Sequence, residues 1–372
     1  MNVLGPASTI GIIGGGQSAF NLTQQALKMG FKVMILADHS ALANHEDVQL
    51  LAGSLQNPAD LQRLFSQSDL VVYDNEDIHL DELTQIAGSQ KLVQGTEILD
   101  LVQDRYLEKS FLNDHNLNIV PFAAVVDNAD LQQTVQEIGF PCILKPIQKD
   151  VGIIDGVIFQ NQAEVDRYQV PQGSFILESL LDIKHEYVIL VSKDWQQQIM
   201  TYPIIQLTSQ DRWLHTALVA DTSDSILQTE INEIAHTIAQ SIEFQGLMAI
   251  KLCTTAADTL YVERIYCGTV FAASIYQALT PYSQEELFLR SVCNWPLPHL
   301  QPLSAGCNLV VTRDNLALVV AELQKHPQWQ LNLIPERLEH DALNPYLGVV
   351  TILGSDYQKL QHYINATKIW KV

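Results

Sequence analysis

Short apolar runs alternate with helical patterns in the first hundred residues. Apolar residues recur at helical spacing over residues 17–29 and again over 60–66. Gly30 follows the first of these segments, where a helix is expected to end. Four apolar runs are typical of buried strands: residues 9–13, 32–37, 69–73 and, more weakly, 91–93. Alternating strands and helices predict a doubly wound parallel sheet, so we expect a Rossmann-like domain over residues 1–98.

Hairpin-like strands dominate the middle of the chain. Residues 99–113 and 225–242 carry the helical pattern, and residues 130–138 and 284–292 repeat it. The predicted strands are residues 121–126, 142–145, 175–178, 186–192, 199–207, 212–219, 246–253, 259–265, 308–311 and 348–353. Prolines at 296, 298 and 302 indicate a linker. The pattern predicts an α+β domain over 99–295, divided at residue 180 into a smaller and a larger subdomain, and a small β-rich C-terminal domain over 296–372.

Composition and charge limit the possible partners. The 372 residues exceed what one core usually supports, and 21 basic against 42 acidic residues give a net charge of -21. Such a field disfavours nucleic acid and anionic membranes, although a local basic pocket can still hold a small phosphorylated ligand. No apolar run reaches the length of a membrane span, and the five scattered cysteines form no C-x-x-C pair. We therefore expect a cytoplasmic protein with free thiols.

A glycine motif follows the first predicted strand. Residues 14–19 (GGGQSA) fit G-x-G-x-x-A, and Asp38 ends the next strand. In dinucleotide-binding proteins these glycines let the backbone approach a phosphate at a helix N-terminus. The alternative is a tight strand-to-helix turn without NAD. An NAD-dependent oxidoreductase would also need a catalytic residue on the nicotinamide side, and the sequence offers none.

A second series of motifs is more distinctive. The series comprises residues 103–109 (QDRYLEK), 139–146 (GFPCILKP), 176–178 (ILE), Glu186, 246–250 (GLMAI) and 261–263 (YVE). In this order the motifs resemble the ATP-grasp superfamily and, within it, the carboxyaminoimidazole ribonucleotide synthetases of purine biosynthesis. The glycine motif, the Tyr73-x-x-Glu76 segment and the tail Leu347-Gly348-x-Val350-Thr351 extend the similarity over nearly the whole chain.

The resemblance implies a binding site for ATP. Arg105 and Lys145 would contact the phosphates, because phosphoryl transfer needs positioned positive charge. Glu178 and the backbone near Leu181 would hold adenine, and Glu186 would accept the ribose hydroxyls. The alternative is that Lys145 is a surface lysine and that the two glutamates are solvated strand residues.

The resemblance also implies a second substrate and a metal. Glu263 would be a Mg²⁺ ligand, whereas Gly15, Gly16, Gln17 and Glu76 would contact the aminoimidazole ribonucleotide. In the family, ATP phosphorylates bicarbonate, and the carboxyphosphate then carboxylates the ribonucleotide amine. A homodimer is expected on the same basis.

The departures from the family surround one cleft. Lys251 stands where the first metal-binding carboxylate is expected, and residues 146–156 lack most of the glycines of a phosphate-covering loop. Residues 264–269 replace a longer Arg-, His- and Asn-bearing loop, residues 206–207 replace a Glu-Asn pair, and residues 344–346 replace basic residues. The sequence indicates relaxed or altered function.

Two classes of function stay open. One is a divergent ATP-dependent ligase, and the other is a non-catalytic homologue with a nucleotide-binding, regulatory or assembly role. We predict that Lys251 pairs with Glu263, that no Mg²⁺ lies between them and that ATP turnover is weak or absent. The alternative is that Lys251 points into solvent, because a register slip of one residue reverses the face of a strand.

Overall fold

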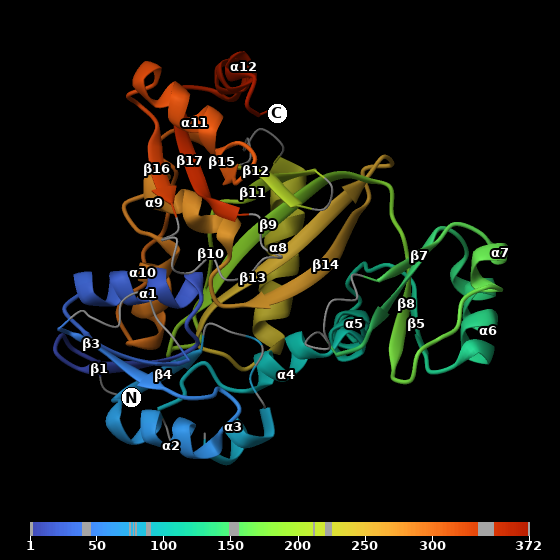
Figure 1. The fold of residues 1–372 in the computed structure, drawn as a ribbon, viewed down its shortest axis with the longest axis horizontal. Coiled ribbons are helices and arrows are strands. Elements are labelled where there is room, and N and C mark those ends of the chain that lie inside the picture. Colours follow the sequence, from blue (N-terminus) through green and yellow to red (C-terminus); the bar gives the residue numbers. More distant parts are fainter. Residues whose placement is uncertain are drawn as a thin grey trace.

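Three sheets organise the chain in the computed structural model (Figure 1). The structure describes residues 3–38, 46–73, 76, 78, 80–86, 91–148, 156–210, 213–219, 225–333 and 346–370. A parallel sheet near the N-terminus and a large antiparallel sheet lie against each other, and a small sheet stands apart at the right of the view. The predicted α/β and α+β fold class is confirmed.

The N-terminal sheet is parallel and has the strand order β3-β2-β1-β4. Its elements are β1 (Thr9–Ile13), α1 (Gln17–Lys28), β2 (Lys32–Ala37), β3 (Val48–Ala52), α2 (Pro58–Gln67), β4 (Leu70–Tyr73) and α3 (Leu80–Ile86). Apolar residues of α1 pack on one face of the sheet and those of α2 on the other. The predicted strand at 91–93 is reduced to a single bridge between Val71 and Leu92, and β3 was not predicted.

The small sheet has the order β5-β8-β6-β7. Its elements, with the two helices that precede it, are α4 (Glu97–Gln103), α5 (Arg105–Asp114), β5 (Phe122–Val125), α6 (Asn128–Ile138), β6 (Cys142–Pro146), β7 (Val157–Phe159), α7 (Gln162–Val165) and β8 (Phe175–Ser179). The single helix predicted over 99–113 was wrong. The chain is extended at Asp104, whose carboxylate accepts a hydrogen bond from the Leu107 amide and so begins a new helix.

The large sheet runs β14-β13-β9-β11-β12-β15-β17-β16, with β10 paired to β9. Its elements up to residue 292 are β9 (Ile183–Lys193), β10 (Ile199–Thr201), β11 (Ile205–Gln210), β12 (Trp213–Val219), α8 (Ser225–Ser241), β13 (Gly246–Thr255), β14 (Leu260–Cys267), the 3₁₀ helix η1 (Phe271–Ile275), α9 (Tyr276–Leu279) and α10 (Gln284–Val292). The strand predicted over 199–207 is two strands, because the chain leaves the ladder between β10 and β11, where Pro203 lacks a backbone donor.

The C-terminal segment continues the same sheet. It contains β15 (Ala305–Thr312), α11 (Leu316–Glu322), η2 (Leu323–Lys325), β16 (Gln330–Leu333), β17 (Tyr346–Gly354) and α12 (Tyr357–Thr367). The pairing of β15 with β12 carries the sheet across the predicted linker. The sequence did not predict α11 and α12, so the tail is less purely β than expected. The domain boundaries at residues 98, 180 and 295 stay predictions.

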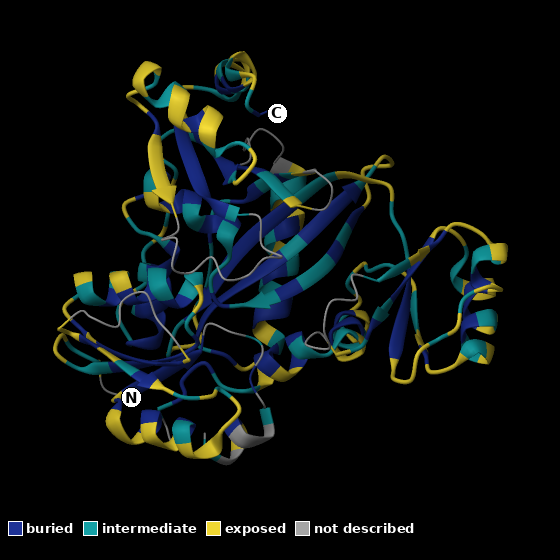
Figure 2. Cartoon of the chain, viewed as in Figure 1, coloured by how far each residue is buried: buried dark blue, intermediate teal, exposed yellow. Residues whose placement is uncertain are grey.

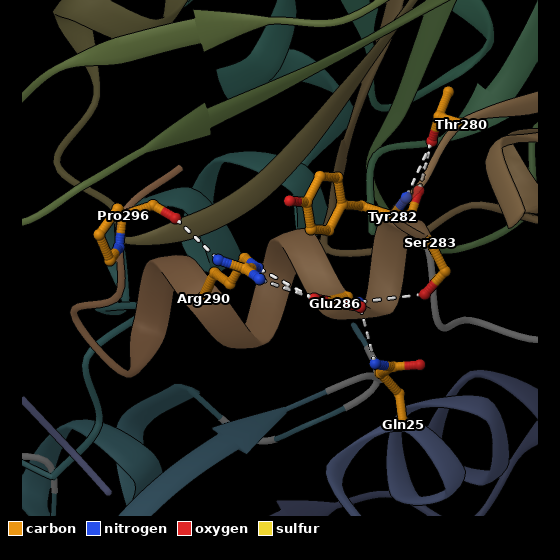
Figure 3. A network of polar contacts seen from close by, with 7 residues as sticks. All are labelled: Gln25, Thr280, Tyr282, Ser283, Glu286, Arg290 and Pro296. Atoms are coloured by element: carbon orange, nitrogen blue, oxygen red, sulfur yellow. Dashed lines mark hydrogen bonds and ion pairs between the residues drawn. The ribbon is translucent and has the colours of Figure 1, made fainter. Parts of the chain in front are cut away.

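Helix α10 joins the large sheet to the N-terminal domain through a polar network (Figure 3). Gln25 on α1 donates a hydrogen bond of 3.1 Å to Glu286. Arg290 donates to the same carboxylate from one turn later, with its Nη2 at 2.9 Å from Oε1. One carboxylate with two partners therefore fixes α10 against α1.

Burial follows the sheets (Figure 2). The central strands are buried, whereas the outward faces of helices such as α2, α6 and α11 are exposed. None of the described helices has the length and apolar character needed to cross a lipid bilayer. The five cysteines form no disulfide, as the sequence predicted.

Candidate functional site

A cavity of about 390 Å³ opens between the small sheet and the edge of the large sheet. Helix α5, strands β6 and β8 and the hairpin of β13 and β14 surround it. The residues that line it include Arg105, Glu108, Lys109, Lys145, Glu178, Leu181, Cys253, Glu263, Arg264 and Tyr266. Of the predicted ATP-binding residues, the structure brings together Arg105, Lys145, Glu178 and Leu181 here, and Glu263 joins them.

Helix α5 ties the two sheets together at the cavity. Arg105 donates from Nη1 to the carbonyl of Pro146 on β6 at 3.1 Å. Lys109 donates from Nζ to the carbonyl of Glu263 on β14 at 3.2 Å, and the carboxylate of Glu108 accepts a hydrogen bond from the Ile265 amide. Both Glu108 and Lys109 are almost fully buried. Arg105 thus holds the backbone of β6, and Glu108 and Lys109 hold the backbone of β14.

A β-bulge in β14 directs two side chains to the cavity. Lys251 pairs with Arg264 across the hairpin, but the next residue of β13, Leu252, pairs with Val262. Glu263 is therefore the extra residue of a bulge, a feature that re-aims side chains. Consequently both Glu263 and its neighbour Arg264 line the cavity.

An ion pair forms on the small sheet. Lys145 on β6 lies 2.8 Å from the carboxylate of Glu178 on β8. Burial would raise the pKa of Glu178, but Lys145, Lys109 and Arg105 outweigh burial and lower it. Glu178 is therefore ionised at neutral pH. The rest of the predicted phosphate loop, residues 149–155, lies outside the described residues.

The side chains that line the cavity include four cations and three carboxylates, an excess of one positive charge. Burial and the nearby Arg264 both lower the pKa of Arg105, although its guanidinium stays charged. Two arginines that repel each other inside a cleft favour an anion between them. This field suits phosphate oxygens.

The predicted contact between Lys251 and Glu263 is confirmed, with Nζ 3.1 Å from Oε1. The sequence did not predict a second partner, yet Nζ also lies 2.5 Å from the carboxylate of Glu186 on β9. Burial would lower the pKa of Lys251, but the two carboxylates outweigh burial and raise it above its ordinary value. Glu186, predicted to accept ribose hydroxyls, is thus engaged by Lys251 and by the Ser209 hydroxyl at 2.5 Å.

None of the predicted ribonucleotide-binding residues lines this cavity, although Glu76 contacts Arg264, which does. Glu76 is held by Arg264 at 3.2 Å and accepts a hydrogen bond of 3.3 Å from the Cys267 amide. Gln17 lines a separate cavity of about 200 Å³ with residues of α1, η1 and α10. Gly16 is the N-cap residue of α1 and provides no side-chain hydrogen bond to the helix. The roles of Gly15, Gly16, Gln17 and Glu76 in binding stay predictions.

Two family models match consecutive parts of the chain. Residues 7–103 match the ribonucleotide synthetase preATP-grasp domain, and residues 110–266 match the ATP-grasp domain. The second match includes both ion-paired clusters and most of the residues that line the cavity, whereas Arg105, Glu108 and Lys109 lie just before it. The chain contains an ATP-grasp domain. The predicted resemblance to the ATP-grasp superfamily is confirmed. The glycine motif at residues 14–19 lies within the matched preATP-grasp domain.

Relatives of this ATP-grasp chain match it over almost its full length. An N5-carboxyaminoimidazole ribonucleotide synthase of Staphylococcus epidermidis is 27% identical over 364 residues, which are 96% of this chain and 95% of the relative. A solved N5-carboxyaminoimidazole ribonucleotide synthetase in complex with ADP superposes with a TM-score of 0.90 at 22% identity, over 99% and 98% of the two chains. The synthase from Aspergillus clavatus, solved with ADP and 5-aminoimidazole ribonucleotide, gives 0.84 at 18% identity, over 97% and 98%. The chain is a homologue of these synthases.

The cluster around Lys251 does not fit the magnesium ion that the resemblance implies. Mg²⁺ requires oxygen ligands in near-octahedral geometry, and an ammonium group between two carboxylates blocks that arrangement. Among the residues that the structure describes, no three His, Cys, Asp or Glu side chains form a metal-binding group. Glu263 as a metal ligand stays a prediction that its neighbours do not favour.

Two charged residues of this ATP-grasp site had no predicted role. Glu108 and Lys109 belong to the QDRYLEK motif, but only Arg105 was given a function. Their burial reveals the role, because buried charges need partners, and the sequence alone does not show that burial.

Proposed function

We propose that the chain binds an adenine nucleotide in the cavity between the small and large sheets. The observation that carries this proposal is the set of cations around the cavity, on a chain whose net charge is -21. Lys145 and Arg105 would contact the phosphates, and Glu178 with the backbone of Leu181 would hold adenine. Similar synthetases have been solved in complex with ADP, which supports the same ligand class.

A second candidate function is the reaction of the curated relatives. In it, ATP phosphorylates bicarbonate, and carboxyphosphate carboxylates aminoimidazole ribonucleotide. The full-length similarity to a named synthase favours this reaction. Gly15, Gly16, Gln17 and Glu76 would contact the ribonucleotide. The Lys251 cluster argues for slow turnover, so a non-catalytic role in regulation or assembly is the alternative.

We also infer the setting of the protein from its lineage and composition. A homodimer follows from the family resemblance. The cytoplasm follows from the free cysteines and the acidic composition. Size-exclusion chromatography with light scattering measures the first, and fractionation of the native cells measures the second.

Calorimetric titration of ADP tests nucleotide binding. Lys145→Ala removes a charge-assisted hydrogen bond and should weaken ADP binding by about 1.5–3 kcal/mol. The matched control is Lys184→Ala, because Lys184 is an exposed lysine on β9 outside the cavity. Equal affinities for the unmodified protein and Lys145→Ala would contradict the assignment. NAD should give no heat in the same assay.

Turnover is tested separately from binding. Release of phosphate from ATP is measured with bicarbonate and aminoimidazole ribonucleotide, beside the Staphylococcus epidermidis relative. We expect little or no release by this chain. A rate equal to that of the relative would overturn the expectation of slow turnover but would leave nucleotide binding intact.

A further inference from the structure

Lys251 stands between two carboxylates that come from both neighbouring strands of β13. Glu186 belongs to β9 and Glu263 to the bulge of β14, and Lys251 Nζ lies 2.5 Å and 3.1 Å from their Oε1 atoms. A metal ion shared by two carboxylates takes the same kind of position, between one oxygen of each. The ammonium group therefore supplies positive charge where the implied metal would supply it.

The surroundings hold this ammonium in place. Its side chain is 19% exposed and lies within the sheet. The backbone of the bulge is held from the other side, because Lys109 and Glu108 bind the carbonyl of Glu263 and the amide of Ile265. The Glu186 carboxylate is held separately by the Ser209 hydroxyl. Lys251 is therefore a built-in part of the site.

We propose that Lys251 replaces the divalent cation, so that the site takes its adenine nucleotide as the metal-free anion. This inference rests on the nucleotide binding proposed above and names the form of the ligand. A free nucleotide carries more negative charge than its magnesium complex and so needs more cations from the protein. The cavity offers four, Arg105, Lys109, Lys145 and Arg264.

One acceptor remains for the ligand. Oε2 of Glu263 is buried and has no hydrogen-bond partner within the described part of the chain. A buried acceptor without a partner is costly, so it favours a hydroxyl or amino donor from the bound molecule. A neighbouring metal ion is not needed to satisfy it.

Titration of ADP in two buffers tests the proposal. The full-length protein is titrated with ADP in EDTA and again in excess Mg²⁺. We expect the unmodified protein to bind ADP at least about threefold more weakly in excess Mg²⁺, because the metal draws the free anion into its complex, whereas Lys251→Glu should bind ADP at least about tenfold more tightly with Mg²⁺ than without it. Lys184→Glu, which makes the same charge change on the neighbouring strand β9, should behave as the unmodified protein. Tightening of about tenfold by Mg²⁺ in the unmodified protein would overturn the proposal.

A second readout does not depend on nucleotide. Mn²⁺ is titrated into the nucleotide-free protein, and bound ion is followed by loss of the free-ion electron paramagnetic resonance signal. The unmodified protein and Lys184→Glu should leave the signal unchanged, and Lys251→Glu should reduce it. Mn²⁺ binding by the unmodified protein at the strength of Lys251→Glu would refute the replacement even if ADP binds.

The two experiments separate this inference from the proposed function. No heat with ADP in either buffer would reject nucleotide binding, and the Mn²⁺ titration would still decide whether Lys251 excludes a metal. Should Lys251→Glu fail to fold by circular dichroism, Lys251→Gln is the second variant. The buffer comparison on the unmodified protein needs no variant.

Discussion

The two walls of the cavity carry opposite imbalances of charge. On the small sheet, Lys145 faces Glu178 at 2.8 Å, and Lys109 and Arg105 act on the same carboxylate. On the large sheet, one cation, Lys251, serves both Glu186 and Glu263. The first wall therefore has positive charge to spare for phosphates. On the second wall, Lys251 already pairs with both carboxylates, at the point where the family resemblance implies a metal.

The comparison teaches that an ATP-grasp cleft has two separable parts. The phosphate-facing wall depends on cations that the sequence motifs still contain. The metal-facing wall can bind a metal only if its carboxylates have no cation of the protein beside them. Lys251 on β13 is such a cation. The proposed binding of a nucleotide without a metal therefore needs no change of fold.

The largest expected effect comes from removing the shared cation. Lys251→Met leaves two carboxylates close together without a counter-charge, which should lower the free energy of unfolding by about 3 kcal/mol. Lys145→Met should cost less, because Lys109 and Arg105 still stabilise Glu178. Urea denaturation at neutral pH measures both variants. An equal or larger loss for Lys145→Met would contradict the difference between the walls.

The sequence predicted the fold better than the contacts within it. Apolar periodicity located β1, α1 and β2, and the motif order located the cavity. The sequence could not show the bulge at Glu263, because a bulge is a property of two paired strands. For the same reason the second partner of Lys251 was missed. Glu186 lies 65 residues earlier in the chain, and only the register of β9 against β13 brings it near.

The two walls should also respond to opposite ends of the pH scale. The pKa of Glu178 is lowered from 4.5, so its stabilisation is present above pH 4.5 and is lost as pH falls through the lowered pKa. The pKa of Lys251 is raised, so its stabilisation is complete below 10.5 and is lost only as pH rises through the raised pKa.

Acid titration of stability therefore isolates the small sheet. Unfolding free energies of the unmodified protein and Glu178→Gln are compared from pH 6 down to about pH 3. The difference between them should shrink as pH falls, because the carboxylate that distinguishes them becomes protonated. A difference that stays constant over this range would mean that folding does not lower the pKa of Glu178.

The smallest effect should come from an ion pair that has the same length as Lys145–Glu178 but lies in water. Lys184 on β9 contacts Asp258, in the turn between β13 and β14, at 2.8 Å, and the two side chains are 45% and 75% exposed. Water solvates both groups almost as well when they are apart, and salt screens their attraction. Lys184→Met should therefore leave the urea midpoint unchanged within error at physiological ionic strength. Lys145→Met, which breaks a contact of equal length around a buried carboxylate, should shift the midpoint. If both variants shifted it equally, burial would not be what distinguishes these pairs, and Lys145 would stabilise the fold no more than an exposed lysine does.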